Sequence, residues 1–164
     1  TLGVGSTFTI TIPFEIAESV EAKPTQGNDA GQADIRGLHL MLAEDNDLNA
    51  EIAKMLLEDA GVIVTVVGDG QQAVSLFQEK PAGTFDVILM DIMMPVMDGL
   101  TATKTIRALG RPDARTIPII AMTANAFEED AQKCLAAGMN AHLVKPLDIG
   151  KLIATIAQYK AKEK

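Results

Sequence analysis

The segment "DVILMDIMMPVMDG", residues 86–99, places one acidic residue, Asp91, inside an apolar run. Four apolar residues precede Asp91, and three apolar residues and a proline follow it. A carboxylate is costly to bury unless a charged group pairs with it. The segment therefore predicts that Asp91 stands at the end of a buried strand, with a charged partner beside it.

Length and composition indicate a globular domain with a tail. The chain has 164 residues, of which 48% are hydrophobic and 22% charged, a balance typical of folded soluble proteins. No run reaches the roughly 18 apolar residues of a membrane span. Residues 1–20 lack the pattern of a signal peptide, so we expect a cytoplasmic protein without direct membrane contact. The net charge of −8 disfavours nucleic acid and favours protein or metal partners.

The first 36 residues differ in pattern from the rest of the chain. Residues 7–14, "TFTITIPF", alternate apolar and polar side chains, as a half-buried strand does. Residues 18–34 are mostly small, polar and charged, which is the composition of a linker. We therefore expect a domain boundary near residue 36.

Five short apolar runs alternate with amphipathic stretches after that boundary. The runs lie at residues 37–43, 62–67, 85–90, 117–122 and 142–145. In the stretch after the first run, Leu48, Ile52, Met55 and Leu56 recur at helical spacing. The apolar runs indicate parallel strands buried on both faces, and right-handed crossovers then give a doubly wound α/β sheet.

Polar residues follow the predicted strands at the sheet edge where ligands of such folds bind. They are Glu44 and Asp45, Gly68 and Asp69, Asp91, Thr123, and Lys145 with Pro146, in strand order. Most of them, taken singly, are explained as helix caps or turns. Capping does not explain Asp91, because apolar residues and a proline follow it.

Together these residues predict a site for phosphoryl transfer. Crowded carboxylates repel one another unless a cation is present, and Mg²⁺ binds through one or two carboxylates plus a phosphate. Lys145 and the Thr123 hydroxyl are suited to contacting phosphoryl oxygens, which leaves Asp91 as the nucleophile. Such transfer needs mainly positioning and charge neutralisation, so no histidine base is required.

The histidines and the single cysteine have structural interpretations. His39 lies inside the first predicted strand, where a packed or tautomer-locked side chain is favoured over a ligand. His142 opens the fifth predicted strand. Cys134 falls in a helical pattern, which favours a buried thiol over a nucleophile.

Residues 37 to about 162 resemble the response regulator receiver domain. The motifs that carry the resemblance are "LAEDN", "LMDIMMPVMDG", "MTANA" and "AAGMNAHLVKPL", in this order. The resemblance implies a flavodoxin-like sheet of five parallel strands in the order 2-1-3-4-5. It also implies that Asp91 accepts a phosphoryl group from a phosphohistidine, and that Thr123 and Lys145 contact that group.

The same resemblance implies a magnesium site and a switch. Asp45, Asp91 and the main-chain carbonyl of Met93 would bind Mg²⁺, with Glu44 helping through water, and the Lys145-Pro146 peptide bond would be cis. Thr123 and His142 stand at the family's switch positions. Receivers usually carry Tyr or Phe where this chain has His142.

The N-terminal segment "GVGSTFTITIPF", residues 3–14, resembles the last strand of a histidine kinase ATP-binding domain. This implies a hybrid histidine kinase in which residues 1–17 are a remnant of the kinase domain, residues 18–36 a linker and residues 37–164 the receiver. The kinase core is absent from the sequence, so only self-phosphorylation and dephosphorylation are expected. The implied partners are a histidine kinase core, in the same polypeptide, and a histidine phosphotransfer protein or domain.

Other functions fit the sequence less well. A receiver-like module that binds partners without phosphorylation is the main alternative, and the intact Asp45, Asp91, Thr123 and Lys145 count against it. A flavodoxin-like cofactor protein would need a glycine-rich phosphate loop where "EDNDLN" stands. A haloacid-type phosphatase would need a second acid where Met93 stands.

Overall fold

The computed structural model describes Gly3, residues 35–124 and residues 128–160. The predicted strand at residues 7–14, residues 18–34 of the predicted linker, and Asn125 and Ala126 of the "MTANA" motif lie outside the described residues. All the strands and helices described below belong to one unit of the chain, Gln32–Lys164.

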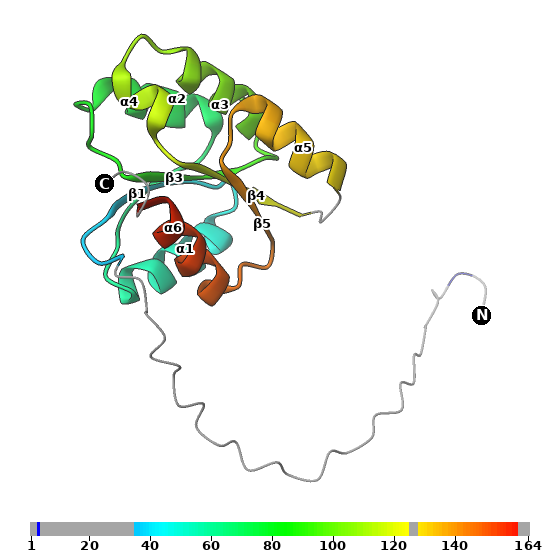
Figure 1. Cartoon of the computed structure of the whole chain (residues 1–164). Helices are drawn as coiled ribbons and strands as arrows, with labels where there is room; N and C mark the ends of the chain where they lie inside the picture. Colours follow the sequence, from blue (N-terminus) through cyan, green and yellow to red (C-terminus); the bar gives the residue numbers. More distant parts are fainter. Residues whose placement is uncertain (1–2, 4–34, 125–127, 161–164) are drawn as a thin grey trace. The chain divides into compact units, whose positions relative to one another are not determined.

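A parallel sheet of five strands forms the middle layer of this unit (Figure 1). Its strands are β1 (His39–Ala43), β2 (Ile63–Val67), β3 (Val87–Asp91), β4 (Ile119–Thr123) and β5 (Ala141–Val144). They lie in the order β2-β1-β3-β4-β5. The pairing of Ala43 with Met90, and of Asp91 with Met122, brings the carboxyl ends of β1, β3 and β4 to one edge. The predicted α/β class, parallel sheet and strand order are confirmed.

Helices cover both faces of the sheet (Figure 1). One face carries α2 (Gly70–Glu79), α3 (Gly99–Ala108), α4 (Pro112–Thr116) and α5 (Glu128–Ala137), and the other carries α1 (Asp47–Asp59) and α6 (Ile149–Lys160). The sequence did not predict α4. Its five residues are too few to produce a periodic apolar pattern, although it begins with a proline, which is favoured in the first turn of a helix.

The core consists of two apolar layers, one on each side of the sheet. Along β1, Met41 enters the layer beneath α2 and α3, whereas Leu40 and Leu42 enter the layer beneath α1 and α6. Every residue of β3 and β4 is buried. Successive side chains of a strand point to opposite faces, which is why strands covered on both faces read as unbroken apolar runs.

Helix α1 packs against the sheet through two alanines and one leucine. Its buried residues are Ala50, Ala53 and Leu57. The larger apolar residues that mark this helix in the sequence are exposed: Leu48 by 69%, Ile52 by 46%, Met55 by 60% and Leu56 by 36%. The apolar stripe of α1 therefore faces away from the core.

The structure corrects the expectation for one of the two histidines. Cys134 is buried, as predicted. His39 is exposed, so its prediction as a packed residue is wrong. It is the first residue of β1, where the strand enters the sheet, and its backbone N–H donates to Asp86 Oδ2 at 2.7 Å. His142 is also exposed, and β5 begins one residue earlier than predicted, at Ala141.

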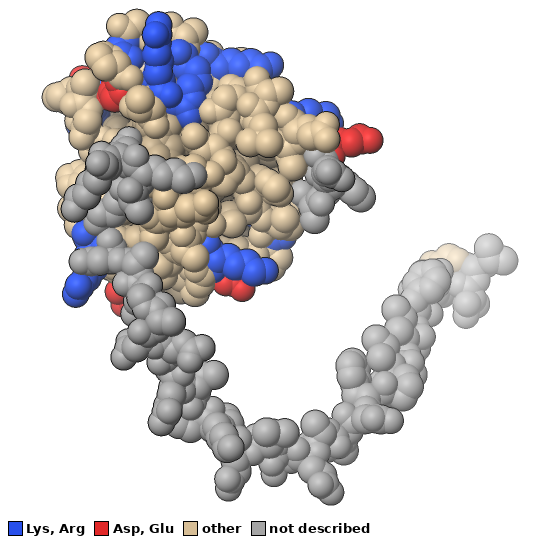
Figure 2. Space-filling view, viewed as in Figure 1, with Lys and Arg blue, Asp and Glu red and all other residues tan. Residues whose placement is uncertain are grey.

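Charged side chains lie mainly toward the margin of the face that Figure 2 presents. Lysine and arginine are spread over several places on this face, with acidic residues beside some of them, and the middle is occupied largely by other residues. In the part of the chain that the structure describes, no helix is both long enough and apolar enough to span a membrane.

Candidate functional site

Three carboxylates meet at the carboxyl edge of the sheet. Glu44 and Asp45 follow β1 directly, and Asp91 is the last residue of β3. One carboxylate oxygen of each residue lies within 4.8 Å of the other two. Glu44 and Asp91 are only 4% and 6% exposed, whereas Asp45 is open to solvent. The structure thus brings together the three acids that the sequence predicts at this edge.

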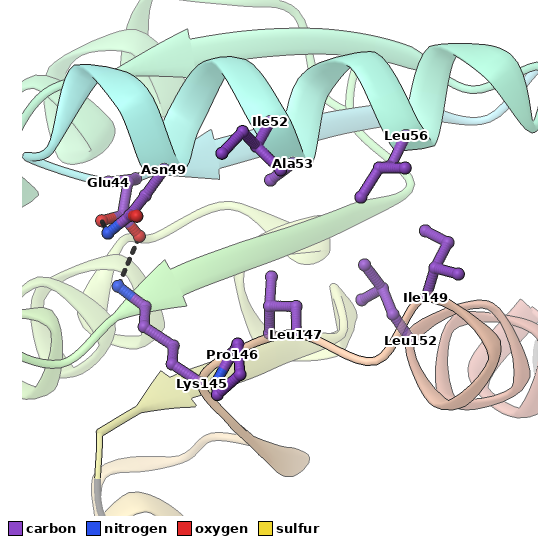
Figure 3. A pocket seen from close by; sticks show the side chains of 10 residues that line it. All are labelled: Glu44, Asn49, Ile52, Ala53, Leu56, Lys145, Pro146, Leu147, Ile149 and Leu152. Atoms are coloured by element: carbon purple, nitrogen blue, oxygen red, sulfur yellow. Dashed lines mark hydrogen bonds and ion pairs between the residues drawn. The ribbon is translucent and has the colours of Figure 1, made fainter. Parts of the chain in front are cut away.

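Lys145 is the charged partner that the position of Asp91 requires. It follows β5 directly, and its Nζ lies 2.5 Å from Asp91 Oδ2 and 2.5 Å from Glu44 Oε2. Its pairing with Glu44 is drawn in Figure 3. The ammonium group therefore neutralises charge on two buried carboxylates, one just after β1 and one at the end of β3.

The electrostatic balance of the site follows from burial and this pairing. Burial raises the pKa of Asp91, and the hydrogen bonds from Lys145 and the Met93 N–H offset that shift only in part. Burial lowers the pKa of Lys145, but its hydrogen bonds to Asp91 and Glu44 outweigh this, so the pKa of Lys145 is raised. Three carboxylates facing one ammonium leave an excess of negative charge.

That excess fits a hard divalent cation. The donor atoms of Glu44, Asp45 and Asp91 are all carboxylate oxygens, the ligand type that Mg²⁺ prefers. Two of the three acids are buried, and buried like charges favour a neutralising ion. The residues present are therefore suited to a magnesium ion.

The loop after β3 is held tightly against Asp91. Asp91 Oδ1 accepts a hydrogen bond from the Met93 N–H at 3.2 Å, and the Gly99 N–H donates to the Ile92 carbonyl at 3.0 Å. A Cβ on Gly99 would overlap the Asp91 carbonyl. The side chains of Met93 and Val96 are 76% and 84% exposed. The role of the Met93 carbonyl as a magnesium ligand stays a prediction.

Two further residues predicted at strand ends, Thr123 and Asp69, make different contacts. Thr123 is the last residue of β4 and buried, and its carbonyl accepts the Lys145 N–H at 2.7 Å, which places these two residues on neighbouring strands. The Lys145-Pro146 peptide bond is cis, as predicted. Asp69, by contrast, caps α2, since its Oδ1 accepts the Gln72 N–H at 2.8 Å. The capping interpretation therefore holds at the end of β2.

A groove of about 410 Å³ runs from the charged site along α1. Its walls come from α1 on one side and, on the other, from the residues after β5 and the start of α6, and the side chains of the two walls face each other in Figure 3. They are Glu44, Asn49, Ile52, Ala53, Leu56, Lys145, Pro146, Leu147, Ile149 and Leu152. One end of the groove is thus charged, and the rest is mostly apolar.

Asn49 also belongs to this site, although it was not predicted from the sequence. Its side-chain amide donates to Glu44 Oε1 at 3.0 Å. The available signal was its place three residues after Asn46, the N-cap of α1, where a polar side chain can reach back past the start of the helix.

Comparison with known proteins identifies the family. The family model of the response regulator receiver domain matches residues 40–157. The chain belongs to the response regulator receiver family. The receiver therefore includes every strand and helix described above, apart from the first residue of β1 and the last residues of α6.

Relatives of this receiver occur in much longer proteins. The autoinducer 2 sensor kinase/phosphatase LuxQ of Vibrio vulnificus is 38% identical over 157 residues, which covers 96% of this chain and 18% of LuxQ. The chain spans less than a fifth of the length of the curated relatives it matches.

Two solved receiver structures bear on the site. The receiver domain of the sensor histidine kinase PA1611 from Pseudomonas aeruginosa is 40% identical, with a TM-score of 0.69 over 76% of this chain and 98% of that one. That structure has a magnesium ion coordinated in its active site cleft. The receiver domain of Ssk1 from Saccharomyces cerevisiae, crystallised with the histidine phosphotransfer protein Ypd1, is 26% identical, with a TM-score of 0.68 over 77% of this chain and 90% of that one.

Proposed function

We propose that this receiver accepts a phosphoryl group on Asp91 from a phosphohistidine of a partner protein, in a magnesium-dependent reaction. The observation that carries the proposal is the contact of Lys145 with Asp91 within a cluster of three carboxylates. An ion pair that only stabilises the fold needs one carboxylate for one ammonium group. Here two further carboxylates, Glu44 and Asp45, stand beside the pair.

In the proposed reaction, an oxygen of the Asp91 carboxylate attacks the phosphorus atom. The new P–O bond forms as the N–P bond to the partner's imidazole breaks, and the imidazole leaves with the bond's electron pair. Lys145 neutralises charge on the transferred group, and the Thr123 hydroxyl hydrogen-bonds to it. Asp45, Asp91 and the Met93 carbonyl would hold a magnesium ion, with Glu44 acting through water, and the ion supplies further positive charge.

We further propose that the exposed stripe of α1 receives the partner. Leu48, Ile52, Met55 and Leu56 form an apolar surface beside the groove that ends at Glu44 and Lys145. An exposed apolar helix face suits an amphipathic helix of the partner. The occupant we propose is the histidine-bearing helix of a phosphotransfer domain, because the groove ends at Lys145, whose ammonium group contacts Asp91.

The last part of the proposal is that the chain comes from a hybrid histidine kinase. The length of its relatives and the N-terminal resemblance support a receiver that follows a kinase core in the same polypeptide. In that arrangement, residues 1–17 are the end of the kinase ATP-binding domain and residues 18–36 a linker. The phosphoryl group would then pass from the kinase to Asp91 and onward to a phosphotransfer protein.

Phosphorylation by a small acyl phosphate tests the chemistry. Wild-type protein incubated with acetyl phosphate and Mg²⁺ is expected to gain one phosphoryl group, detected by intact mass spectrometry. Asp91→Asn is expected to gain none, and Glu51→Gln, on the exposed side of α1, is expected to react like the wild type. A receiver that only binds partners would give no adduct in any of the three proteins.

Substitutions on α1 test the docking surface. Ile52→Glu and Leu56→Glu are expected to slow transfer from a phosphorylated phosphotransfer domain at least tenfold, while uptake from acetyl phosphate stays unchanged. Leu135→Glu is the matched control, because Leu135 is also an exposed leucine, on α5 across the sheet. Equal effects of Leu135→Glu and Ile52→Glu would contradict the docking surface on α1.

A further inference from the structure

Both carboxylate oxygens of Glu44 are engaged by side chains from different parts of the chain. Oε1 accepts from the Asn49 amide at 3.0 Å, and Oε2 accepts from Lys145 Nζ at 2.5 Å. Glu44 is only 4% exposed, so water does little to orient it. The plane of this carboxylate is therefore set by Asn49 on one side and Lys145 on the other.

The position of Asn49 is itself fixed by the start of α1. Its backbone N–H donates to the side chain of Asn46, the N-cap, at 3.0 Å. The next residue, Ala50, donates its N–H to the Asn46 carbonyl at 2.9 Å and is buried against the core. The first turn of the helix thus holds the amide of Asn49 in register with Glu44.

This arrangement decides how Lys145 is shared. Its ammonium group contacts both Glu44 Oε2 and Asp91 Oδ2 at 2.5 Å. Without a donor on Oε1, the Glu44 carboxylate is free to rotate and present both oxygens to Lys145. The ammonium would then be drawn toward Glu44 and away from Asp91. A neutral amide donor prevents this without adding a second positive charge to the site.

We propose that Asn49 is a positioning residue for phosphoryl transfer, which holds Glu44 so that Lys145 remains directed at Asp91. The inference rests on the proposed function for its effect on rate. Its structural part, the control of Lys145 by Asn49, stands independently of that function.

The test compares Asn49→Ala and Asn49→Asp with Asn46→Ala. Asn49→Ala isolates the loss of the donor, whereas Asn49→Asp keeps the shape of the side chain but replaces the donor with an acceptor and adds a negative charge. Asn46→Ala removes the helix cap while retaining the Asn49 amide, so it reports the effect of a weakened helix start alone. Thermal denaturation establishes that each variant is folded.

The first measurement is the NMR signal of the Lys145 side chain (ε-methylene and ammonium groups) in Mg²⁺-free protein. Both Asn49 variants are expected to shift this signal, and Asn46→Ala, which loosens Asn49 but keeps its amide, is expected to shift it less. The second is the rate of phosphorylation by acetyl phosphate at saturating Mg²⁺. The Asn49 variants are expected to be about three- to tenfold slower, as the loss of one hydrogen bond implies, and Asn46→Ala is expected to lie closer to the wild type than to either Asn49 variant.

Two results would overturn the inference. One is a Lys145 signal and a rate that do not change in either Asn49 variant. The other is an equally large shift of the Lys145 signal and an equally large loss of rate in Asn46→Ala. That result would mean that Asn49 acts only by supporting the start of the helix. If the wild type takes up no phosphoryl group, the proposed function fails, and the Lys145 signal still decides whether Asn49 controls Lys145.

Discussion

Lys145 Nζ lies 2.5 Å from Asp91 Oδ2, although 54 positions separate the two residues in the sequence. They meet because β3 and β5 run parallel on either side of β4, which brings their carboxyl ends to one edge. The contact lowers the cost of burying Asp91 but does not remove it, since burial still raises the pKa of this carboxyl group. The site is therefore under electrostatic strain before any phosphoryl group arrives.

Asp91→Asn is expected to stabilise the Mg²⁺-free protein at pH 7. The pKa of Asp91 is higher in the folded than in the unfolded protein, where it is near 3.8. The folded state then binds the proton more tightly, so ionisation above that pH reduces stability. The gain should appear in urea denaturation at pH 7 and shrink toward zero as the pH falls below 3.8. A variant less stable than the wild type at pH 7 would contradict this electrostatic balance.

Asp113→Asn is expected to destabilise the protein at neutral pH. Hydrogen bonds from Arg111 lower the pKa of Asp113 to about 2, and its Oδ2 also accepts the Gly83 N–H at 2.9 Å. Because the pKa is lower in the folded state, this stabilisation is present above pH 3.8 and is lost as the pH falls toward 2. We expect a loss of about 1 kcal/mol at pH 7, allowing for solvent screening, and almost no difference at pH 2, measured by urea denaturation. A loss that is independent of pH would count against the ion pair as its cause.

Gly99→Ala is expected to destabilise the receiver by about 1–3 kcal/mol and to slow phosphorylation of Asp91. The added Cβ would overlap the Asp91 carbonyl and lie 2.9 Å from Met90 Cγ, so the end of β3 must shift. Gly110→Ala is the matched control, since no atom lies within 4 Å of its Cβ position. Thermal denaturation and acetyl phosphate kinetics of both variants check the prediction, and similar losses in the two would refute the close approach at Gly99.

Asn140→Ala is expected to lower the free energy of unfolding by about 1–2 kcal/mol, the net contribution of two hydrogen bonds. Asn140 Oδ1 accepts from the backbone N–H of Ile119 at 2.8 Å and from Arg107 Nη2 at 2.9 Å. Ile119 is completely buried but Asn140 is exposed, so water replaces the lost acceptor only in part. Asn140→Asp keeps an acceptor for both donors and should retain most of the stability. Chemical denaturation distinguishes the two, and equal losses would contradict the assignment of Oδ1 as the acceptor.

Much of the fold could be predicted because its signals are local. The strand order was implied by the resemblance, and burial on both faces followed from the unbroken apolar run before Asp91. The exposure of His39 could not be predicted, because a single residue at a strand end carries no pattern. The same holds for α4, where Arg111 and Asp113 pair across two positions and no periodicity marks the helix.

The candidate site, too, was predicted from the sequence in part and decided by the tertiary structure in part. The sequence by itself determined that Asp91 needs a charged partner and that Glu44, Asp45 and Lys145 follow strands of one sheet. Only the tertiary structure decided that Lys145 is shared between Asp91 and Glu44, that Asn49 holds Glu44, and that the apolar stripe of α1 faces outward. The physical reason is that periodicity reports how apolar each side of a helix is, whereas the neighbouring elements determine which side is covered. In α1, Ala50, Ala53 and Leu57 lie against the sheet, and the other apolar side chains of the helix remain exposed.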